Sequence, residues 1–442
     1  MEQHIKEMIQ KKTEMGFSPD RAQEVGYVSS VQGYILEVSG LTGVMFYEKV
    51  IIDGHSEGYV NNIYRSHVMV AVVREGGQIY TDSEVVATGE IFEAAYSEAS
   101  IGHMVDIFGR DRMNGLQFDD LERLPIENRT TPIMDRTAVN RPLETGIAGI
   151  DLIYPIGKGQ RQLIIGDKKT GKSQIALDAI VNQRGKDVLC IYVSIGKTKK
   201  SMKEIYADLS RRGALDYTIM LAAFNDDMPP VLYLTPYVGL TIAEKYMMQG
   251  KDVLVVLDDL SRHADNYREI SLLVGKTPGR DAYPPDIFYT HSRMLEKGCQ
   301  HKCGGSITVL PIVETRGGDI TDYISTNIIS ITDGQIVLSK KSFDQNQKPA
   351  INYGLSVSRL GGAVQPEPVK KLGAKVRREL LSYLETREVY QLTNMDEMGK
   401  ELQDKIHRGE EIMSALCQYK YSPLSHDEII GRFRHLYQEE QP

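Results

Sequence analysis

Cysteine is scarce in this chain, with four residues among 442: Cys190, Cys299, Cys303 and Cys417. They are too few and too widely spaced to form a disulfide scaffold. Cys299 and Cys303 lie close in sequence, but no second pair of ligands follows with which they would hold a zinc ion. We therefore expect reduced thiols, as in most cytosolic proteins.

Three further features are missing. No apolar run is long enough to span a membrane. Residues 1–16 mix Glu2, Glu7 and Glu14 with lysines, which is not typical of a secretory signal or a transit peptide. A surplus of positive charge is also lacking, since the formal net charge is −8, and nucleic-acid binding needs clustered lysine and arginine. These absences predict a cytoplasmic protein that does not bind nucleic acid.

A glycine-rich motif is the strongest positive signal. Residues 166–173, Gly-Asp-Lys-Lys-Thr-Gly-Lys-Ser, fit the pattern G-x-x-x-x-G-K-[ST] between an apolar strand at 163–165 and a helix at 174–180. Backbone N–H groups of such a loop wrap a phosphate at the positive end of the helix dipole, whereas an ordinary glycine turn would not need both flanks. We expect Lys172 to contact the β- and γ-phosphates and Ser173 to bind Mg²⁺. The predicted nucleotide-binding residues of the loop are Gly166, Asp167, Lys168, Lys169, Thr170, Gly171, Lys172 and Ser173.

A second nucleotide-binding signal follows 85 residues after Ser173. The apolar residues 253–257 lead directly into Asp258 and Asp259. A buried strand that delivers an aspartate beside the phosphate loop is a common way to hold Mg²⁺ through its water shell. We expect Asp258 to face the metal and Asp259 to bond its neighbours or the loop.

Hydrophobic and turn patterns divide the chain into four parts. Residues 1–25 are expected to form a polar N-terminal arm, and residues 26–94 the short strands of a small β-barrel. In residues 95–365 apolar strands alternate with helices, which indicates an α/β P-loop domain with a mainly parallel sheet. Residues 366–442 have helical spacing and predict a helical domain. Core strands are expected at 163–165, 188–193, 219–221, 253–257, 307–310 and 328–331.

Several longer motifs occur together in a fixed order, at 155–173, 258–268, 278–284, 291–296, 311–315, 330–335 and 349–359. They resemble the alpha subunit of F-type rotary ATP synthases, and the resemblance runs from about residue 26 to residue 423. It implies a RecA-like central domain that binds ATP or ADP with Mg²⁺. It also implies a hexameric ring with catalytic beta subunits, a central gamma-type shaft and a peripheral stalk. Contact with the inner face of the cell membrane would come only through that complex, which moves protons or sodium ions.

The resemblance also implies roles for single residues. Arg359 matches the arginine finger that an alpha subunit gives to a neighbouring catalytic site, where a guanidinium is worth about 10³–10⁵ in rate. The alternative for Arg359 is a structural ion pair with a nearby carboxylate. Ser330, at the end of the predicted strand 328–331, matches another residue that lines the neighbouring site. The adenine is expected near Lys348, Phe343, Gln418 and Lys420.

A catalytic base is missing from the expected position. ATP hydrolysis needs a carboxylate that activates water near the γ-phosphate. In the beta family this glutamate follows the strand after the phosphate-loop helix, and alpha subunits usually have glutamine there. This chain has Lys197, a cation that cannot act as a base at neutral pH, and we expect it to contact a phosphate oxygen or to be solvated. The isolated chain is therefore expected to be inactive, as a regulatory subunit would be.

The chain also departs from the family pattern in other places. Lys348 stands where alpha subunits usually have arginine, and Lys420 where they often have glutamine. The chain ends 19 residues after Pro423, whereas family members continue with further helices, so we expect a shortened helical domain and unusual coupling to shaft and stalk. Three alternatives stay open: a specialised F-like ATPase that does not make ATP, a nucleotide-gated scaffold, and a self-sufficient homohexameric helicase or secretion ATPase. A self-sufficient motor would need its own glutamate in place of Lys197.

Overall fold

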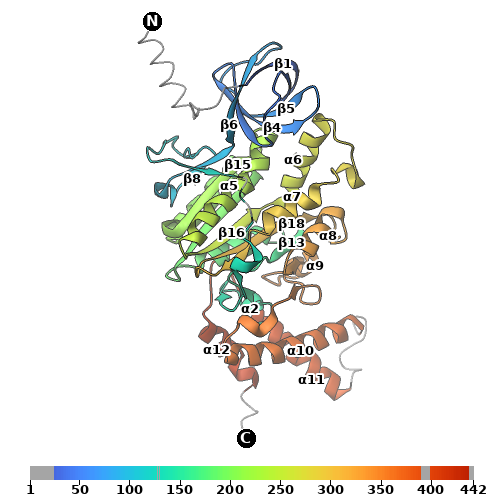
Figure 1. The fold of residues 1–442 in the computed structure, drawn as a ribbon. Helices are drawn as coiled ribbons and strands as arrows, with labels where there is room; N and C mark the ends of the chain where they lie inside the picture. Colours follow the sequence, from blue (N-terminus) through green and yellow to red (C-terminus); the bar gives the residue numbers. More distant parts are fainter. Residues whose placement is uncertain (1–23, 127, 129, 390–398, 438–442) are drawn as a thin grey trace.

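Three parts follow one another along the chain (Figure 1). A small barrel lies at one end, a large sheet with helices lies in the middle, and a group of helices lies at the other end. This computed structural model describes residues 24–126, 128, 130–389 and 399–437. The expected N-terminal arm, residues 1–25, lies outside the described residues except for its last two positions. The predicted fold class is confirmed in its three main parts.

Six strands close into the N-terminal barrel in the order β1, β2, β5, β4, β3, β6. They are β1 (Val25–Gln32), β2 (Ile35–Ser39), β3 (Glu48–Ile52), β4 (Ser56–Ile63), β5 (Val68–Arg74) and β6 (Glu84–Ile91). Branched side chains such as Val28, Val50 and Val70 fill the interior. Such side chains pack well on the pleated inner face, and closure leaves no edge free to pair with another chain.

The core of the central sheet is parallel. Its strands are β13 (Leu163–Asp167), β14 (Val188–Lys197), β15 (Thr218–Phe224), β16 (Asp252–Asp258), β18 (Ser306–Thr315) and β19 (Gly334–Leu338). They lie side by side in the order β19, β13, β18, β16, β14, β15. Nearly all of their residues are buried, because helices cover both faces of a sheet of this kind. Five of the six predicted core strands are confirmed.

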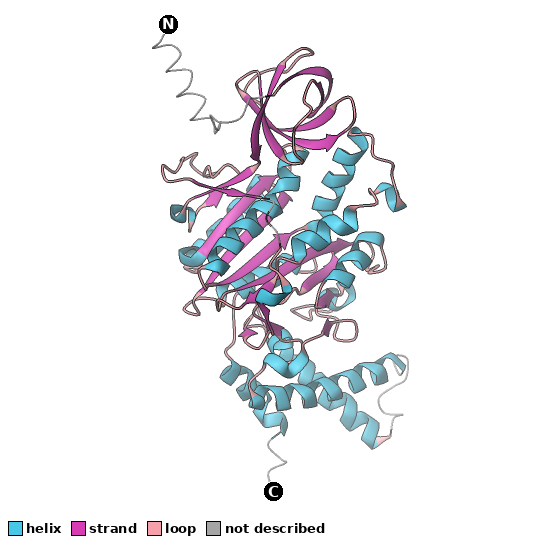
Figure 2. Cartoon of the chain, viewed as in Figure 1, coloured by secondary structure: helices cyan, strands magenta, loops and turns pink. Residues whose placement is uncertain are grey.

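Helices cover the two faces of this sheet (Figure 2). They are α3 (Lys172–Val181), α4 (Lys199–Arg211), α5 (Pro229–Met248), α6 (Leu260–Leu273), α7 (Ile287–Leu295) and α8 (Tyr323–Ile331). Helices α3 and α4 share one apolar cluster with Ile164, and the other four share a second cluster with Ile165. Successive strand residues face opposite sides of a sheet, which explains this division. Because the strands are parallel, their carboxyl ends meet at one edge, where such sheets bind ligands.

Residues 328–331 do not form the predicted strand; they are the last turn of helix α8. Asp322 caps this helix by accepting a hydrogen bond from a backbone N–H of its first turn. Ile324 and Ile328 lie one turn apart and are both buried. A short apolar run does not by itself distinguish a strand from a buried helix. Ser330 therefore lies near the end of a helix and not at the end of a strand.

The C-terminal part is helical, as predicted, and its described residues form α10 (Glu367–Val389), α11 (Lys400–Leu416) and α12 (His426–Tyr437). Their buried side chains, among them Val376, Ile412 and Phe433, belong to the same apolar cluster as α3 and α4. The shorter elements are β7 (Glu93–Tyr96), β8 (Met104–Val105), β9 (Glu122–Pro125), β10 (Arg136–Thr137), β11 (Pro142–Leu143), α2 (Ala148–Asp151), β12 (Ile156–Gly157), β17 (Cys299–His301), α9 (Lys340–Asp344) and β20 (Val357–Ser358).

Gly409→Ala is expected to destabilise the protein by about 1–3 kcal/mol. Gly409 lies on α11, and a Cβ at this position would overlap the ring of the buried Tyr383 on α10. Overpacking then outweighs the gain in helix propensity, which is about 1 kcal/mol. Gly431 on α12 is the matched control, since nothing lies within 4 Å of a Cβ there. Urea unfolding of both variants measures the effect, and equal changes at the two positions would contradict the close packing of α10 and α11.

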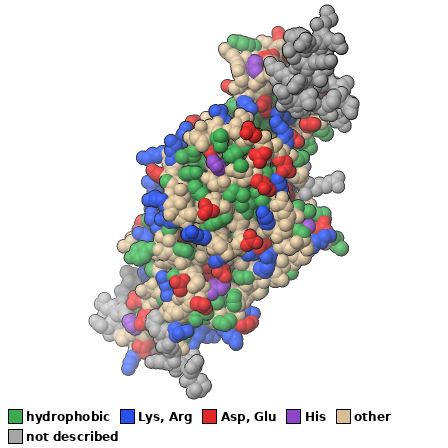
Figure 3. Space-filling view, turned by 90° about the vertical axis from the view of Figure 1, so that its left-hand side faces the viewer, with side chains coloured by type: hydrophobic (Ala, Val, Ile, Leu, Met, Phe, Trp, Pro, Cys, Tyr) green, Lys and Arg blue, Asp and Glu red, His purple; other side chains and the backbone are tan. Residues whose placement is uncertain are grey.

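No helix of the described residues is both long enough and apolar enough to cross a lipid bilayer. On the face of the molecule shown in Figure 3, acidic and basic side chains are interspersed with apolar ones. Interspersed charges of both signs are typical of the solvated surface of a globular protein.

Candidate nucleotide-binding site

A cavity of about 860 Å³ lies at the carboxyl edge of the central sheet. The loop after β13 and the ends of β14, β16 and β18 contribute to its wall. Its volume lies within the range of small-molecule sites, roughly 300–1,000 Å³. The predicted residues that line it include Lys168, Lys169, Thr170, Gly171, Lys172, Ser173, Asp258, Phe343, Lys348, Gln418 and Lys420. Gly166 and Asp167, also predicted, lie at the end of β13 and are not among the lining residues.

The loop between β13 and α3 is shaped to receive an anion. Gly171 directly precedes α3 with a φ of 101°, a left-handed conformation that glycine adopts without strain. Oγ1 of Thr170 donates a hydrogen bond of 2.8 Å to the carbonyl oxygen of Asp167 and closes the turn. No side chain caps α3, so the first N–H groups of the helix and its positive dipole end are available to a phosphate.

Lys172 is the buried cation of the loop, with a side chain that is only 7% exposed. Its ammonium donates hydrogen bonds of 2.8 and 2.6 Å to the carbonyl oxygens of Gly166 and Asp167. The carboxylate of Glu314, at the end of β18, lies 3.9 Å from the same nitrogen. Burial lowers the pKa of Lys172, and the negative charge of Glu314 acts in the opposite direction. The ammonium is thus placed where phosphate oxygens would enter the loop.

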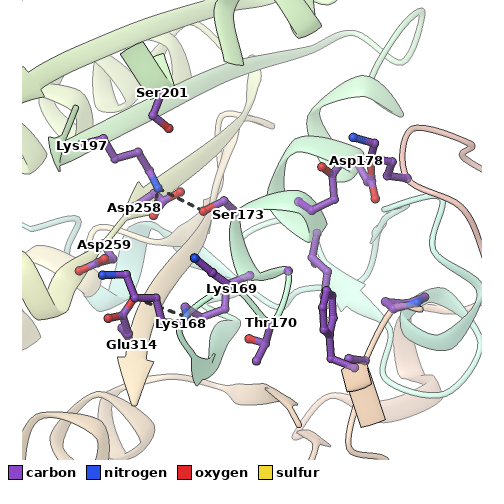
Figure 4. A pocket seen from close by; sticks show the side chains of 18 of the residues that line it. Lys168, Lys169, Thr170, Ser173, Asp178, Lys197, Ser201, Asp258, Asp259 and Glu314 are labelled. Carbon is purple, nitrogen blue, oxygen red and sulfur yellow. Dashed lines mark hydrogen bonds and ion pairs between the residues drawn. The ribbon is translucent and has the colours of Figure 1, made fainter. Parts of the chain in front are cut away.

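Ser173 and Asp258, the two residues predicted to face Mg²⁺, are joined by the ammonium of Lys197 (Figure 4). Nζ of Lys197 lies 3.2 Å from Oγ of Ser173 and 3.1 Å from Oδ1 of Asp258. The other carboxylate oxygen of Asp258 accepts a hydrogen bond of 2.6 Å from the Tyr192 hydroxyl. Mg²⁺ takes oxygen ligands at about 2.0–2.1 Å, and an ammonium repels it. In this arrangement the side chains do not fit Mg²⁺ between Ser173 and Asp258.

Asp259 begins helix α6, where its carboxylate accepts a hydrogen bond of 2.8 Å from the N–H of Arg262. It bonds a neighbour, as predicted. Burial raises the pKa of Asp259 to about 6, and the negative charge of the adjacent Asp258 acts in the same direction. Arg262 also lines the cavity and was not predicted, although an arginine that follows the paired aspartates by one helical turn is a signal that could have been used.

The residues predicted for the nucleobase, Lys348, Phe343, Gln418 and Lys420, line the same cavity. Nζ of Lys348 lies 5.4 Å from the ring centre of Phe343. The side-chain amide of Gln418 donates to two carbonyl groups and accepts one backbone N–H, so it holds the chain segment in place. Tyr419 and Lys420 also line the cavity, and Tyr419 is 87% exposed. Aromatic rings and ammonium groups together suit the stacking of a nucleobase.

Glu314 and Tyr419 are further lining residues of the cavity that were not singled out from the sequence. Glu314 lies beside Gly166 in the register of β18 with β13. The signal for Glu314 was a carboxylate at the end of an apolar strand, the same signal that identified Asp258. It was missed because the predicted strand 307–310 stops short of the observed end of β18 at Thr315. Tyr419 carries no comparable local signal, because only the packing of the C-terminal helices brings it to the cavity.

Arg359 and Ser330 lie outside this cavity, close together on the surface. Both are exposed, Ser330 on α8 and Arg359 directly after β20. Nη2 of Arg359 donates a hydrogen bond of 3.4 Å to the carbonyl oxygen of Ile329, the residue before Ser330. Within the described part of the chain Arg359 has no carboxylate partner. Its alternative role, an ion pair inside the protein, is therefore not supported.

Comparisons with known proteins agree with this site. The model of the ATP synthase alpha/beta family, nucleotide-binding domain, matches residues 146–358. The ATP synthase subunit alpha of Lactobacillus johnsonii is 41% identical over 434 residues, which cover 97% of this chain and 86% of that protein. That of Clostridium acetobutylicum is 41% identical over 420 residues, covering 91% and 82%, respectively. The alpha subunit of Ureaplasma parvum is 42% identical over 437 residues, covering 97% and 53%. The chain therefore belongs to the family of ATP synthase alpha subunits.

Proposed function

We propose that this chain is a nucleotide-binding, non-catalytic alpha-type subunit of a rotary ATP synthase or ATPase. It binds ATP or ADP in the cavity at the carboxyl edge of the sheet. It contributes Arg359 to the catalytic site of a neighbouring subunit. The uncapped loop with its buried Lys172 supports the binding of a phosphate group, and the family supports the kind of complex.

The proposed assembly is a ring in which this chain alternates with catalytic beta-type subunits around a gamma-type shaft. A peripheral stalk contacts the ring, and the complex lies on the inner face of the cell membrane, where it couples ATP to the movement of protons or sodium ions. The names of the relatives as alpha subunits of ATP synthase support this assembly. We also propose the boundaries of the parts: an arm at 1–25, a barrel at 26–94, the nucleotide-binding domain at 95–365 and the helical domain at 366–442.

The observation that carries the non-catalytic assignment is the ammonium of Lys197 at the end of β14. The resemblance places the catalytic glutamate of beta subunits after this strand. Here the position holds a cation whose nitrogen lies 3.1 Å from a carboxylate oxygen of Asp258. An ammonium cannot take a proton from water at neutral pH. Asp258 is used in this ion pair, and Asp259 is used as the cap of α6.

Glu314 is the carboxylate whose role bears on the non-catalytic assignment. It lines the cavity, and its side chain is 37% exposed. A general base must face the water that attacks the γ-phosphate. The ion pair at 3.9 Å with Lys172 directs Glu314 to the loop instead, which supports a role in holding the lysine.

The isolated chain is expected to bind ATP but to hydrolyse it only at the background rate. Equilibrium binding of a fluorescent ATP analogue and release of inorganic phosphate measure the two properties on the same preparation. Glu314→Gln is the matched variant, because it keeps the size of the side chain and removes its basicity. Brisk turnover by the wild-type chain that Glu314→Gln abolishes would identify Glu314 as a base and overturn the non-catalytic assignment. Failure to bind nucleotide would overturn the proposed function as a whole.

A further inference from the structure

The ammonium of Lys197 is held at a point where three elements of the fold meet. Lys197 ends β14, Ser173 lies in the first turn of α3, and Asp258 ends β16. The two contacts of Nζ, 3.2 Å to Ser173 and 3.1 Å to Asp258, are of hydrogen-bond length. The Lys197 side chain is 23% exposed and that of Asp258 only 2%. The pair is thus largely shielded from water, which strengthens it in comparison with a surface ion pair.

The backbone of β14 fixes this position. Strands β14 and β16 pair in parallel up to Ser194 and Asp258. Beyond that point the register of β14 with β15 shifts between Ile195 and Lys197. Gly196, at the shift, has a φ of 74°, which side chains other than glycine rarely allow. A bulge of this kind re-aims the next side chain, and here that side chain is the lysine that crosses to Asp258.

The chemistry of this arrangement is that of a fixed cation beside the phosphate loop. Ser173 and Asp258 use two of the three N–H donors of the ammonium, which leaves one for a phosphate oxygen. The second oxygen of Asp258 is taken by the Tyr192 hydroxyl. A divalent cation bound directly by Ser173 would have to displace the ammonium from that hydroxyl, because a direct ligand of Mg²⁺ comes within about 2.0–2.1 Å. The lysine supplies positive charge at the place where Mg²⁺ was expected.

We propose that this site binds its nucleotide without a divalent cation, and that Lys197 is the built-in counter-charge for the phosphates. The ligand is then the free nucleoside di- or triphosphate and not its magnesium complex. The proposal rests on the proposed function, because it concerns the same nucleotide site. It also assigns a role to the residue that departs from both the alpha and the beta pattern.

The wild-type chain provides the first test. Binding of ADP and ATP is measured by isothermal titration calorimetry, once with excess Mg²⁺ and once with excess EDTA. We expect binding in EDTA to be at least as tight as binding with excess Mg²⁺, because Mg²⁺ in solution removes the free nucleotide that the site takes. Binding that requires Mg²⁺ would overturn this inference and leave the proposed function standing. Absence of binding in both conditions would overturn the proposed function and this inference with it.

The variant Lys197→Gln provides the second test. Glutamine removes the charge and frees Ser173 and Asp258, so we expect binding that is about tenfold tighter, or more, with Mg²⁺ than with EDTA. Lys199→Gln is the matched control: it removes one charge from the same segment, but Lys199 is exposed and does not line the cavity. The control should behave as the wild type does. Metal dependence that is equal in Lys197→Gln and in the wild type would contradict the inference.

A spectroscopic measurement detects a bound metal ion directly, independently of any effect of the metal on affinity. Mn²⁺ replaces Mg²⁺, and electron paramagnetic resonance counts the ions that stay with the nucleotide-loaded chain after gel filtration. We expect about one ion per chain for Lys197→Gln and much less than one for the wild type, since the ligands that a hard cation prefers are free only in the variant. One Mn²⁺ per wild-type chain would overturn the proposal. Because this measurement and the EDTA comparison both use the wild type, the proposal stays testable if the variant does not fold.

Discussion

Arg359→Lys in a reconstituted ring with catalytic partner subunits is expected to lower multi-site ATP turnover by roughly 10³-fold. The planar guanidinium offers paired donors to a phosphoryl group in transition, which the point charge of lysine does not match. Arg359 is exposed, is held to the end of α8 by its bond to Ile329, and lies outside its own cavity. These properties suit a residue that acts on a neighbouring subunit and not on its own nucleotide.

Two measurements distinguish this role from a structural one. Nucleotide binding to the isolated Arg359→Lys chain is expected to equal that of the wild type, because the residue does not line the cavity. Arg211→Lys is the matched control in the ring, since Arg211 is an exposed arginine of α4 whose side chain is 71% accessible. Turnover that falls equally in both variants would indicate general damage to the ring. Unchanged turnover in Arg359→Lys would mean that the arginine finger lies elsewhere.

Much of the fold could be predicted because its signals are local. The phosphate loop can be recognised from one motif that lies between a strand and a helix. Buried parallel strands can be recognised because they are uninterrupted apolar runs. The barrel strands β3 and β4 were harder to locate, because polar residues interrupt them. Glu48 on β3 is buried and accepts N–H groups of Met45 and Gly89, both at 2.8 Å. From the sequence, such a glutamate would be expected at the surface, and only the closed barrel explains its burial.

The position of Lys197 could be found in the sequence, but its partners could not. The sequence predicts contact with a phosphate or with solvent, and the structure adds two protein partners, since it places the ammonium between Ser173 and Asp258. That contact depends on the register of β14 with β16 and on the bulge at Gly196. Registers between strands that are far apart in sequence are set by packing of the whole sheet. Such registers therefore cannot be predicted from the residues around Lys197 alone.

Lys172→Gln is expected to weaken nucleotide binding to the isolated chain by about 10²-fold, the size of one or two charge-assisted hydrogen bonds. Lys172 is the buried cation of the loop, held toward the phosphates by the carbonyl oxygens of Gly166 and Asp167. Glutamine keeps a donor but not the charge. Binding of ADP in the presence of EDTA measures the loss. Lys203→Gln is the control for loss of charge, because Lys203 is an exposed residue of α4.

The same variant is expected to fold at least as stably as the wild type. Burial lowers the pKa of Lys172, which means that the folded chain disfavours the charged form relative to the unfolded chain. A neutral side chain removes that cost, and Glu314 loses its partner where it is 37% exposed and can be solvated. The unfolding temperature of Lys172→Gln should therefore equal or exceed that of the wild type while binding is lost. A lower unfolding temperature together with unchanged affinity would show that Lys172 supports the fold of the loop and does not bind phosphate.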